Sequence, residues 1–74
     1  MDYHKRIIID SARRSGKPCI KNTRISVQDI LEYLAGGMTE QQIIDDFPEL
    51  EREDIRAALQ FAADRERTIK IITA

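Results

Sequence analysis

The hydrophobic positions in the middle of the chain recur at helical spacing. Val27, Ile30, Leu31 and Leu34 follow one another at i, i+3, i+4 and i+7, which places them on one face of an α-helix. Ser26 comes directly before this run and offers a capping hydroxyl, and two glycines at positions 36 and 37 follow it. The pattern predicts a first helix that begins at Ser26 and stops at the glycines.

Two further helices are predicted downstream of the glycines. Thr39 and Gln42 have the spacing of a capping box, and Pro48 disfavours helical geometry at the residue before it, so a second helix of about two turns lies between them. A third helix is expected over residues 52–67. Its apolar stripe consists of Ile55, Ala58, Leu59 and Ala62, with Phe61 beside it. A short helix, a turn and a longer helix predict a helix-turn-helix, with the first helix packed across both.

Both ends of the chain have the composition of extended structure. Residues 7–9 are three isoleucines, and residues 15–18 (Ser-Gly-Lys-Pro) form a turn signal. Two short extended pieces are expected at residues 19–20 and 24–25, around a turn in which Asn22 tolerates a left-handed conformation. Residues 68–72 are β-branched and partly alternate, which predicts a C-terminal strand. Its pairing partner is either residues 7–9 of the same chain or a strand of a second chain.

The predicted fold class is therefore mainly α: a three-helix bundle of helix-turn-helix type in a single domain of 74 residues. Residues 1–25 form an extended arm with a short strand, residues 26–67 the bundle, and residues 68–74 a strand or tail. A domain of this size buries only about 60–65% of its unfolded surface, so association into a homodimer would stabilise it.

Charge divides the chain into two unequal parts. Residues 1–25 hold seven Lys or Arg against two acidic residues, whereas residues 26–74 hold five against eleven. A basic arm on an acidic body favours contact of the arm with a polyanion or self-complementary association. An ordinary solvated surface, whose halves attract each other weakly, remains equally open.

The sequence offers little catalytic chemistry. His4 is the only histidine and lies near the terminus, and Cys19 is the only cysteine, which fits a reducing cytosol. No glycine-rich phosphate loop and no calcium-loop spacing occur. No apolar run approaches the roughly 20 residues that span a bilayer, and no signal peptide precedes the domain. We expect a cytoplasmic protein without enzymatic activity, metal or cofactor.

Candidate nucleic-acid contacts lie on the predicted third helix and on the arm. Arg52, Arg56 and Gln60 are expected on the exposed helix face, where Arg56 would read guanine and Gln60 adenine. Glu53 and Asp64 on the same face would repel phosphates. The candidate phosphate contacts on the arm are Lys17, Lys21 and Arg24.

Arg24 has two possible roles. It precedes the first helix and lies near Asp29 and Glu32 in sequence, so a charge-assisted hydrogen bond would fasten the arm to the bundle. The alternative is a phosphate contact made together with Lys17 and Lys21. We favour the structural role.

Four collinear segments within residues 7–63 carry a family resemblance. Residues 16–27 read GKPCIKNTRISV and resemble the signature G-K-P-x-I-x-G-T-R-I-P-V of the family called domain of unknown function 433. Residues 34–39 (LAGGMT), 47–50 (FPEL) and 53–59 (EDIRAAL) resemble its downstream segments. Asn22 stands where the signature has glycine and Ser26 where it has proline. Both exchanges are compatible with the predicted backbone.

The resemblance implies a homeodomain-like or winged-helix-like three-helix fold and a function. Members of this family are described as antitoxins similar to the VapB type, often dimeric and encoded beside a PIN-like ribonuclease toxin. This implies a DNA-binding autorepressor that contacts operator DNA and neutralises the toxin. Ile69, Ile71 and Ile72 are the candidate toxin-binding residues, although a C-terminal strand that completes a sheet with residues 7–9 is the simpler expectation. The alternative function is a protein-interaction or dimerisation module that never touches DNA.

Overall fold

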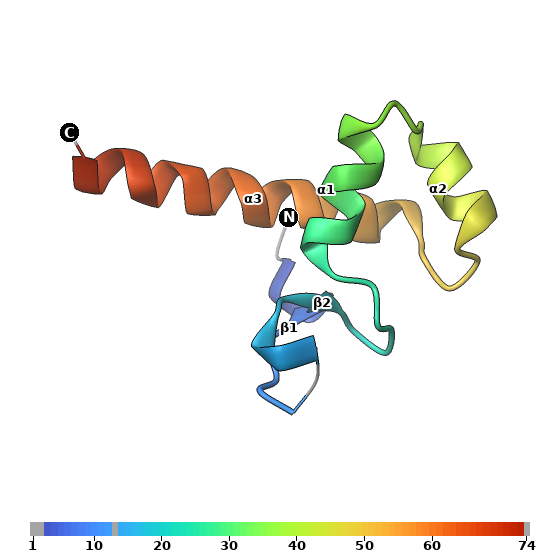
Figure 1. The fold of residues 1–74 in the computed structure, drawn as a ribbon, viewed down its shortest axis with the longest axis horizontal. Coiled ribbons are helices and arrows are strands. Elements are labelled where there is room, and N and C mark those ends of the chain that lie inside the picture. Colours follow the sequence, from blue (N-terminus) through green and yellow to red (C-terminus); the bar gives the residue numbers. More distant parts are fainter. Residues whose placement is uncertain (1–2, 13, 74) are drawn as a thin grey trace.

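The computed structural model describes the backbone of residues 3–12 and 14–73 and the side chains of residues 3–12 and 14–67. Figure 1 shows three helices with a small antiparallel sheet beside them. In chain order the elements are a 3-10 turn Tyr3–Lys5, strand β1 Ile7–Ile8, a 3-10 turn Arg14–Gly16, strand β2 Cys19–Ile20, and helices α1 Val27–Ala35, α2 Glu40–Asp46 and α3 Arg52–Thr73. The mainly α class and the three-helix arrangement are confirmed.

The predicted starts of α1 and α2 are confirmed by complete capping boxes. The Ser26 hydroxyl accepts a hydrogen bond from the Asp29 N–H at 2.9 Å, and the Asp29 carboxylate accepts one from the Ser26 N–H at 3.0 Å. Thr39 and Gln42 repeat the arrangement at 3.1 and 2.9 Å. Each box satisfies two backbone donors that the first turn of a helix leaves without a partner.

α1 also ends at the two glycines, as the sequence predicts. Gly36 caps the helix, and Gly37 follows with a φ of +101°, in the left-handed region that favours glycine. The Met38 N–H then reaches back to the Tyr33 carbonyl at 3.1 Å, which closes the helix end and turns the chain toward α2.

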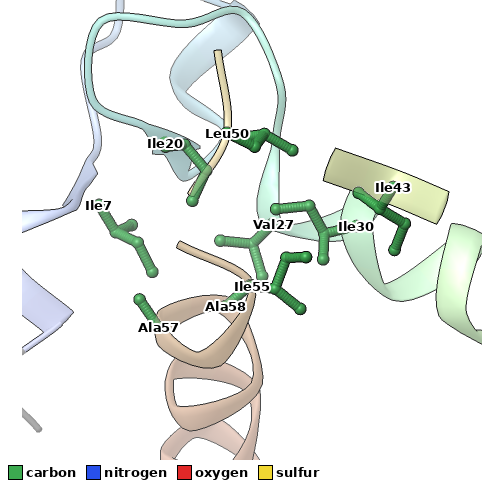
Figure 2. Close-up of a cluster of buried hydrophobic side chains, with 9 residues drawn as sticks. All are labelled: Ile7, Ile20, Val27, Ile30, Ile43, Leu50, Ile55, Ala57 and Ala58. Carbon is green, nitrogen blue, oxygen red and sulfur yellow. The ribbon is translucent and has the colours of Figure 1, made fainter. Parts of the chain in front are cut away.

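The core lies where α1, α2, the sheet and the first half of α3 meet (Figure 2). Ile30, Ile43 and Ile55 are completely buried and come from the three different helices. The full cluster consists of Ile7, Ile20, Val27, Ile30, Ile43, Leu50, Ile55, Ala57 and Ala58. Burial of aliphatic side chains contributed by every element makes these short elements depend on one another.

The buried face of α3 differs in part from the predicted stripe. Ile55 and Ala58 are completely buried as expected, but Leu59 is 44% exposed and Ala57 is fully buried. The reason is that α3 is covered on two sides, by α1 and by the N-terminal 3-10 turn, whose Tyr3 ring meets Phe61 edge to face at 5.5 Å. Because the 3-10 turn covers this second side of α3, the buried part of the helix surface includes Ala57 and excludes Leu59.

The predicted C-terminal strand is wrong. α3 does not end at residue 67 but continues for 22 residues to Thr73, so residues 68–72 are helical. Extending a formed helix by one residue fixes few new dihedral angles, and no glycine or proline interrupts it here. Moreover, Ile7 is already paired with Ile20 of the same chain, in the register that also pairs Ile8 with Cys19.

A helix that crosses a membrane must be both long and apolar. Among the helices that the structure describes, none is both long and apolar enough to cross a bilayer.

The turn after β2 has the left-handed residue that the sequence predicts. Asn22 has a φ of +66°, a conformation that asparagine tolerates better than other non-glycine residues. Thr23 is buried, and its hydroxyl donates to the Ile20 carbonyl at 2.9 Å and accepts from the Ile25 N–H at 3.0 Å. This hydroxyl closes the turn, which brings residue 25 beside β2.

A pair of matched substitutions tests this account of the core. Ile30→Val removes one methylene group from a fully buried site and is expected to lower the free energy of unfolding by about 0.5–1.5 kcal/mol. Ile9→Val makes the same change where the side chain is 64% exposed and should alter it by less than about 0.5 kcal/mol. Urea denaturation measures both, and equal effects would contradict the described core.

Candidate interaction surfaces

Helices α2 and α3, joined by residues 47–51, are the predicted helix-turn-helix unit. Two of the three DNA-contact candidates on α3 are engaged within the chain. The Arg52 guanidinium bonds to Glu40 at 3.3 Å and to Gln41 at 3.0 Å, so it ties the start of α3 to the start of α2. The Gln60 amide donates to Asp64 at 3.0 Å. Arg56 is exposed and forms no ion pair with another described residue.

The surface around the start of α3 is acidic. Glu49, Glu51 and Glu53 are exposed there and precede Arg56 in the sequence. Carboxylates at this position repel the phosphates that flank the major groove. The charge of this surface therefore disfavours entry of α3 into DNA.

The three predicted phosphate contacts of the arm are exposed but are not brought together in one site. Lys17 lines a groove between the arm, α1 and α3. Lys21 lines a different cleft, where Glu49 and Glu51 lie among the facing residues. Arg24 belongs to neither cavity lining. The positive charge of the arm is thus distributed around β2 rather than concentrated.

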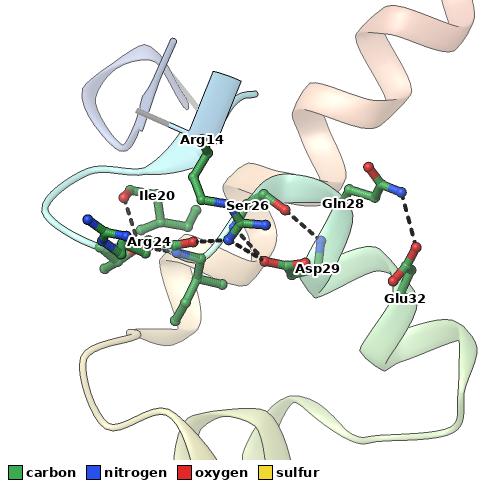
Figure 3. Close-up of polar contacts among 9 residues, drawn as sticks. Arg14, Ile20, Arg24, Ser26, Gln28, Asp29 and Glu32 are labelled. Atoms are coloured by element: carbon green, nitrogen blue, oxygen red, sulfur yellow. Dashed lines mark hydrogen bonds and ion pairs between the residues drawn. The ribbon is translucent and has the colours of Figure 1, made fainter. Parts of the chain in front are cut away.

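The residue that fastens the arm to the bundle is Arg14, not Arg24 (Figure 3). Its guanidinium donates to the Arg24 carbonyl and to the Asp29 carboxylate, the latter at 3.3 Å. The structural role predicted for the Arg24 side chain therefore falls to Arg14. Arg14 has a φ of +51°, in a left-handed turn shared with Ser15 and Gly16. Nothing in the local sequence signals this conformation at an arginine.

A second clamp, which sequence reasoning missed, joins the arm to α3. Arg6 contacts Asp54 at 3.0 Å and Glu51 at 3.5 Å. The Asp54 side chain is only 8% exposed, and its other oxygen accepts the Glu51 N–H at 2.8 Å, which caps α3. The hydrogen bond to Asp54 is the main cause that raises the pKa of Arg6 above its usual value, against the opposing effect of desolvation. Arg6 and Asp54 lie 48 residues apart, so no local pattern links them.

The groove that contains Lys17, which we call the α1–α3 groove, has a volume of about 580 Å³. Its apolar lining includes Val27, Leu31, Phe61 and Ala62, and its charged lining is Lys17, Arg65 and Glu66. The Arg65 guanidinium lies over the Phe61 ring, 5.5 Å from its centre. The groove thus has an apolar lining bordered by charges of both signs.

Beyond Glu66, α3 projects away from the rest of the molecule (Figure 1). We call residues 67–73 the α3 overhang. The predicted partner-binding residues Ile69, Ile71 and Ile72 lie on it, but their side chains are outside the described residues. The groove and the overhang are therefore adjacent, because Glu66 lines the one and directly precedes the other.

The fold and these surfaces define a small three-helix domain whose N-terminal arm is held by the ion pairs of Arg6 and Arg14. The sequence profile of the family described as "Protein of unknown function (DUF433)" matches residues 7–62, and the chain belongs to this family. The structure is similar to the crystal structure of a DUF433 member protein from Anabaena variabilis ATCC 29413, with a TM-score of 0.78 and 28% identity over 86% of this chain. The chain spans 63% of the length of that protein. None of the curated proteins compared with the chain matches it.

The hydrogen bonds and ion pair that Asp29 forms make the stability of the fold depend on pH in a defined direction. Burial acts to raise the pKa of Asp29, but hydrogen bonds from the Ser26 backbone and hydroxyl, together with Arg14, lower it below its ordinary value of 3.8. Because the folded pKa is the lower one, ionised Asp29 stabilises the fold above pH 3.8, and this contribution is lost as the pH falls through the folded pKa. Asp29→Asn should destabilise the protein at neutral pH, with the difference shrinking in acid. Urea denaturation of both proteins across pH 2.5–7 measures this, and a difference independent of pH would contradict it.

Proposed function

We propose that this protein is an antitoxin-type interaction module that acts in the cytoplasm by contact rather than by catalysis. Its partner would be a PIN-like ribonuclease toxin, which the module neutralises by occupying part of the toxin surface. The observation that supports this proposal is the α3 overhang, a helical segment that projects from the body beside an apolar groove.

The overhang offers a partner apolar side chains on a helical backbone. Propagation from the first half of α3 accounts for the helical backbone of the overhang, so the contribution of a partner would lie in side-chain packing. The overhang also contains Ile69, Ile71 and Ile72, and burying an isoleucine side chain against a partner is worth about 1.5–3 kcal/mol. A protein partner that covers the overhang would supply both the packing and the burial.

A co-expression experiment tests the toxin proposal. The double variant Ile69→Asp with Ile72→Asp should lose the ability to rescue growth from a PIN-like toxin encoded beside the gene, because carboxylates would be placed in the partner contact. Ile9→Asp makes the same kind of change at a side chain that is 64% exposed on the arm and should rescue like the natural protein. Pull-down of the toxin and a ribonuclease assay measure the same contrast. Rescue by the double variant would contradict the proposal.

A second function, binding of operator DNA, is favoured by the exposed cations. Lys17, Lys21, Arg24 and Arg56 are exposed, and none forms an ion pair with another described residue. Four such cations are sufficient for a salt-dependent contact with phosphates. In a homodimer their number would double, which compensates for their spread over the surface. The acidic surface at the start of α3 argues for contact with the backbone rather than with base edges.

Gel-shift titrations with the protein's own upstream DNA test this second function. Arg24→Ala with Lys21→Ala should leave the melting temperature unchanged, because Arg14 and not Arg24 fastens the arm. The double variant should bind DNA more weakly, and the slope of log K against log salt should fall by about 1 for each phosphate that its side chains no longer reach. The absence of any shift at low salt would leave a protein-interaction module without DNA binding.

A further inference from the structure

The α1–α3 groove has the size and the lining of a site for a small ligand. Its volume of about 580 Å³ lies within the roughly 300–1,000 Å³ that is typical of such sites. Leu31 of α1 and Phe61 and Ala62 of α3 line it, and each of these side chains is half-buried. A ligand that covers them removes their remaining apolar surface from water.

Two cations from different elements line the same groove. Lys17 of the arm and Arg65 of α3 form no ion pair with another residue in the described part of the chain. The Arg65 guanidinium lies 5.5 Å from the centre of the Phe61 ring, a cation–π contact that holds this charge at the apolar lining.

The charge of the lining selects the kind of anion. Glu66 is the one acidic residue among the described residues that line the groove, so Lys17 and Arg65 exceed it by one positive charge. A carboxylate carries one negative charge and balances this excess. A phosphate monoester carries about −1.5 to −2 at neutral pH and would leave negative charge without a partner.

The backbone that presents Lys17 is held in place on both sides. The Lys17 N–H donates to the Arg14 carbonyl at 3.1 Å, and the next residue, Pro18, accepts from the Val27 N–H at 2.9 Å. Arg14 is in turn bonded to Asp29 of α1 (Figure 3). The arm therefore needs no rearrangement to carry Lys17 beside the groove, and such preorganisation lowers the cost of binding.

We propose that the α1–α3 groove binds a small organic acid, whose carboxylate lies between Lys17 and Arg65 and whose apolar body covers Leu31, Phe61 and Ala62. The inference is independent of the proposed toxin contact, because none of these residues lies on the overhang. The ligand would touch the arm, α1 and α3 at once. Its binding would therefore stabilise the packing of these three segments and raise the melting temperature.

Titration of the purified 74-residue chain with 4-phenylbutyrate, followed by ¹⁵N NMR, tests the proposal. The acid should shift the amide signals of the groove residues and bind with a dissociation constant of about 1 mM, as expected for so small a ligand. 4-Phenylbutanol and 4-phenylbutylamine have the same apolar body without the carboxylate. Both should bind about tenfold more weakly, because they lack the charge-assisted hydrogen bonds. The acid, and not the amine, should raise the melting temperature.

Substitutions separate the charged and apolar parts of the site. Lys17→Ala and Arg65→Ala should each weaken binding of the acid by about tenfold, and Lys17→Ala should leave binding of the alcohol unchanged. Lys21→Ala removes an exposed lysine that lines a different cleft and should change neither affinity. Ala62→Phe fills the groove and should abolish binding of both compounds. Circular-dichroism melts without ligand establish that each variant is folded.

Several results would overturn the proposal. They are unchanged groove signals at about 10 mM acid, equal affinities for the acid and the amine, or full binding of the acid by folded Ala62→Phe. An end-capped phenylalanyl-glutamate dipeptide, which carries the same two groups on a peptide, should bind no more tightly than the acid. Tighter binding of the dipeptide by tenfold or more would assign the groove to a protein partner instead.

Discussion

The packing of α1 against the first half of α3 is the contact on which the rest of the structure depends. Ile30 of α1 and Ile55 of α3 are both completely buried and belong to the same cluster (Figure 2). α2 has only seven residues and the sheet only two residues in each strand, so neither element is stable by itself. Each adds an isoleucine to this contact and is held in place by it. A chain of 74 residues has little further surface to bury, so the remaining order comes from caps and clamps.

Two ion pairs between the arm and the helices account for part of the charge asymmetry of the chain. Arg6 and Arg14 of the basic arm bond to Asp54 and Asp29, the acidic residues that cap α3 and α1. Part of the positive charge that suggests a polyanion partner is thus bound within the protomer, at the positive ends of two helices where carboxylates are favoured. The same carboxylates stabilise a helix start and anchor the arm. The cations that remain exposed are fewer and lie farther apart than the sequence implies.

The arrangement of α3 connects the fold to the proposed functions. Its first half belongs to the core, its middle lines a groove, and its end leaves the body. A single helix therefore joins the core to the proposed docking surface, with no loop between them. Partners that bind the overhang would be held at a fixed orientation to the helix-turn-helix unit. One continuous helix thus belongs to both surfaces to which a toxin and DNA are proposed to bind.

The sequence by itself determined the features that depend on neighbouring residues. The capping boxes at Ser26 and Thr39, the stop at Gly37 and the left-handed Asn22 are set by interactions within five residues, so local patterns predicted them. The tertiary structure decided the rest. It covered α3 on a second side, which exposed Leu59 and buried Ala57, and it paired β1 with β2, which left residues 68–72 to continue as helix. It also gave the anchoring role to Arg14 instead of Arg24. Each of these outcomes depends on which elements meet in space, and residues that meet from distant parts of the chain leave no local pattern in the sequence.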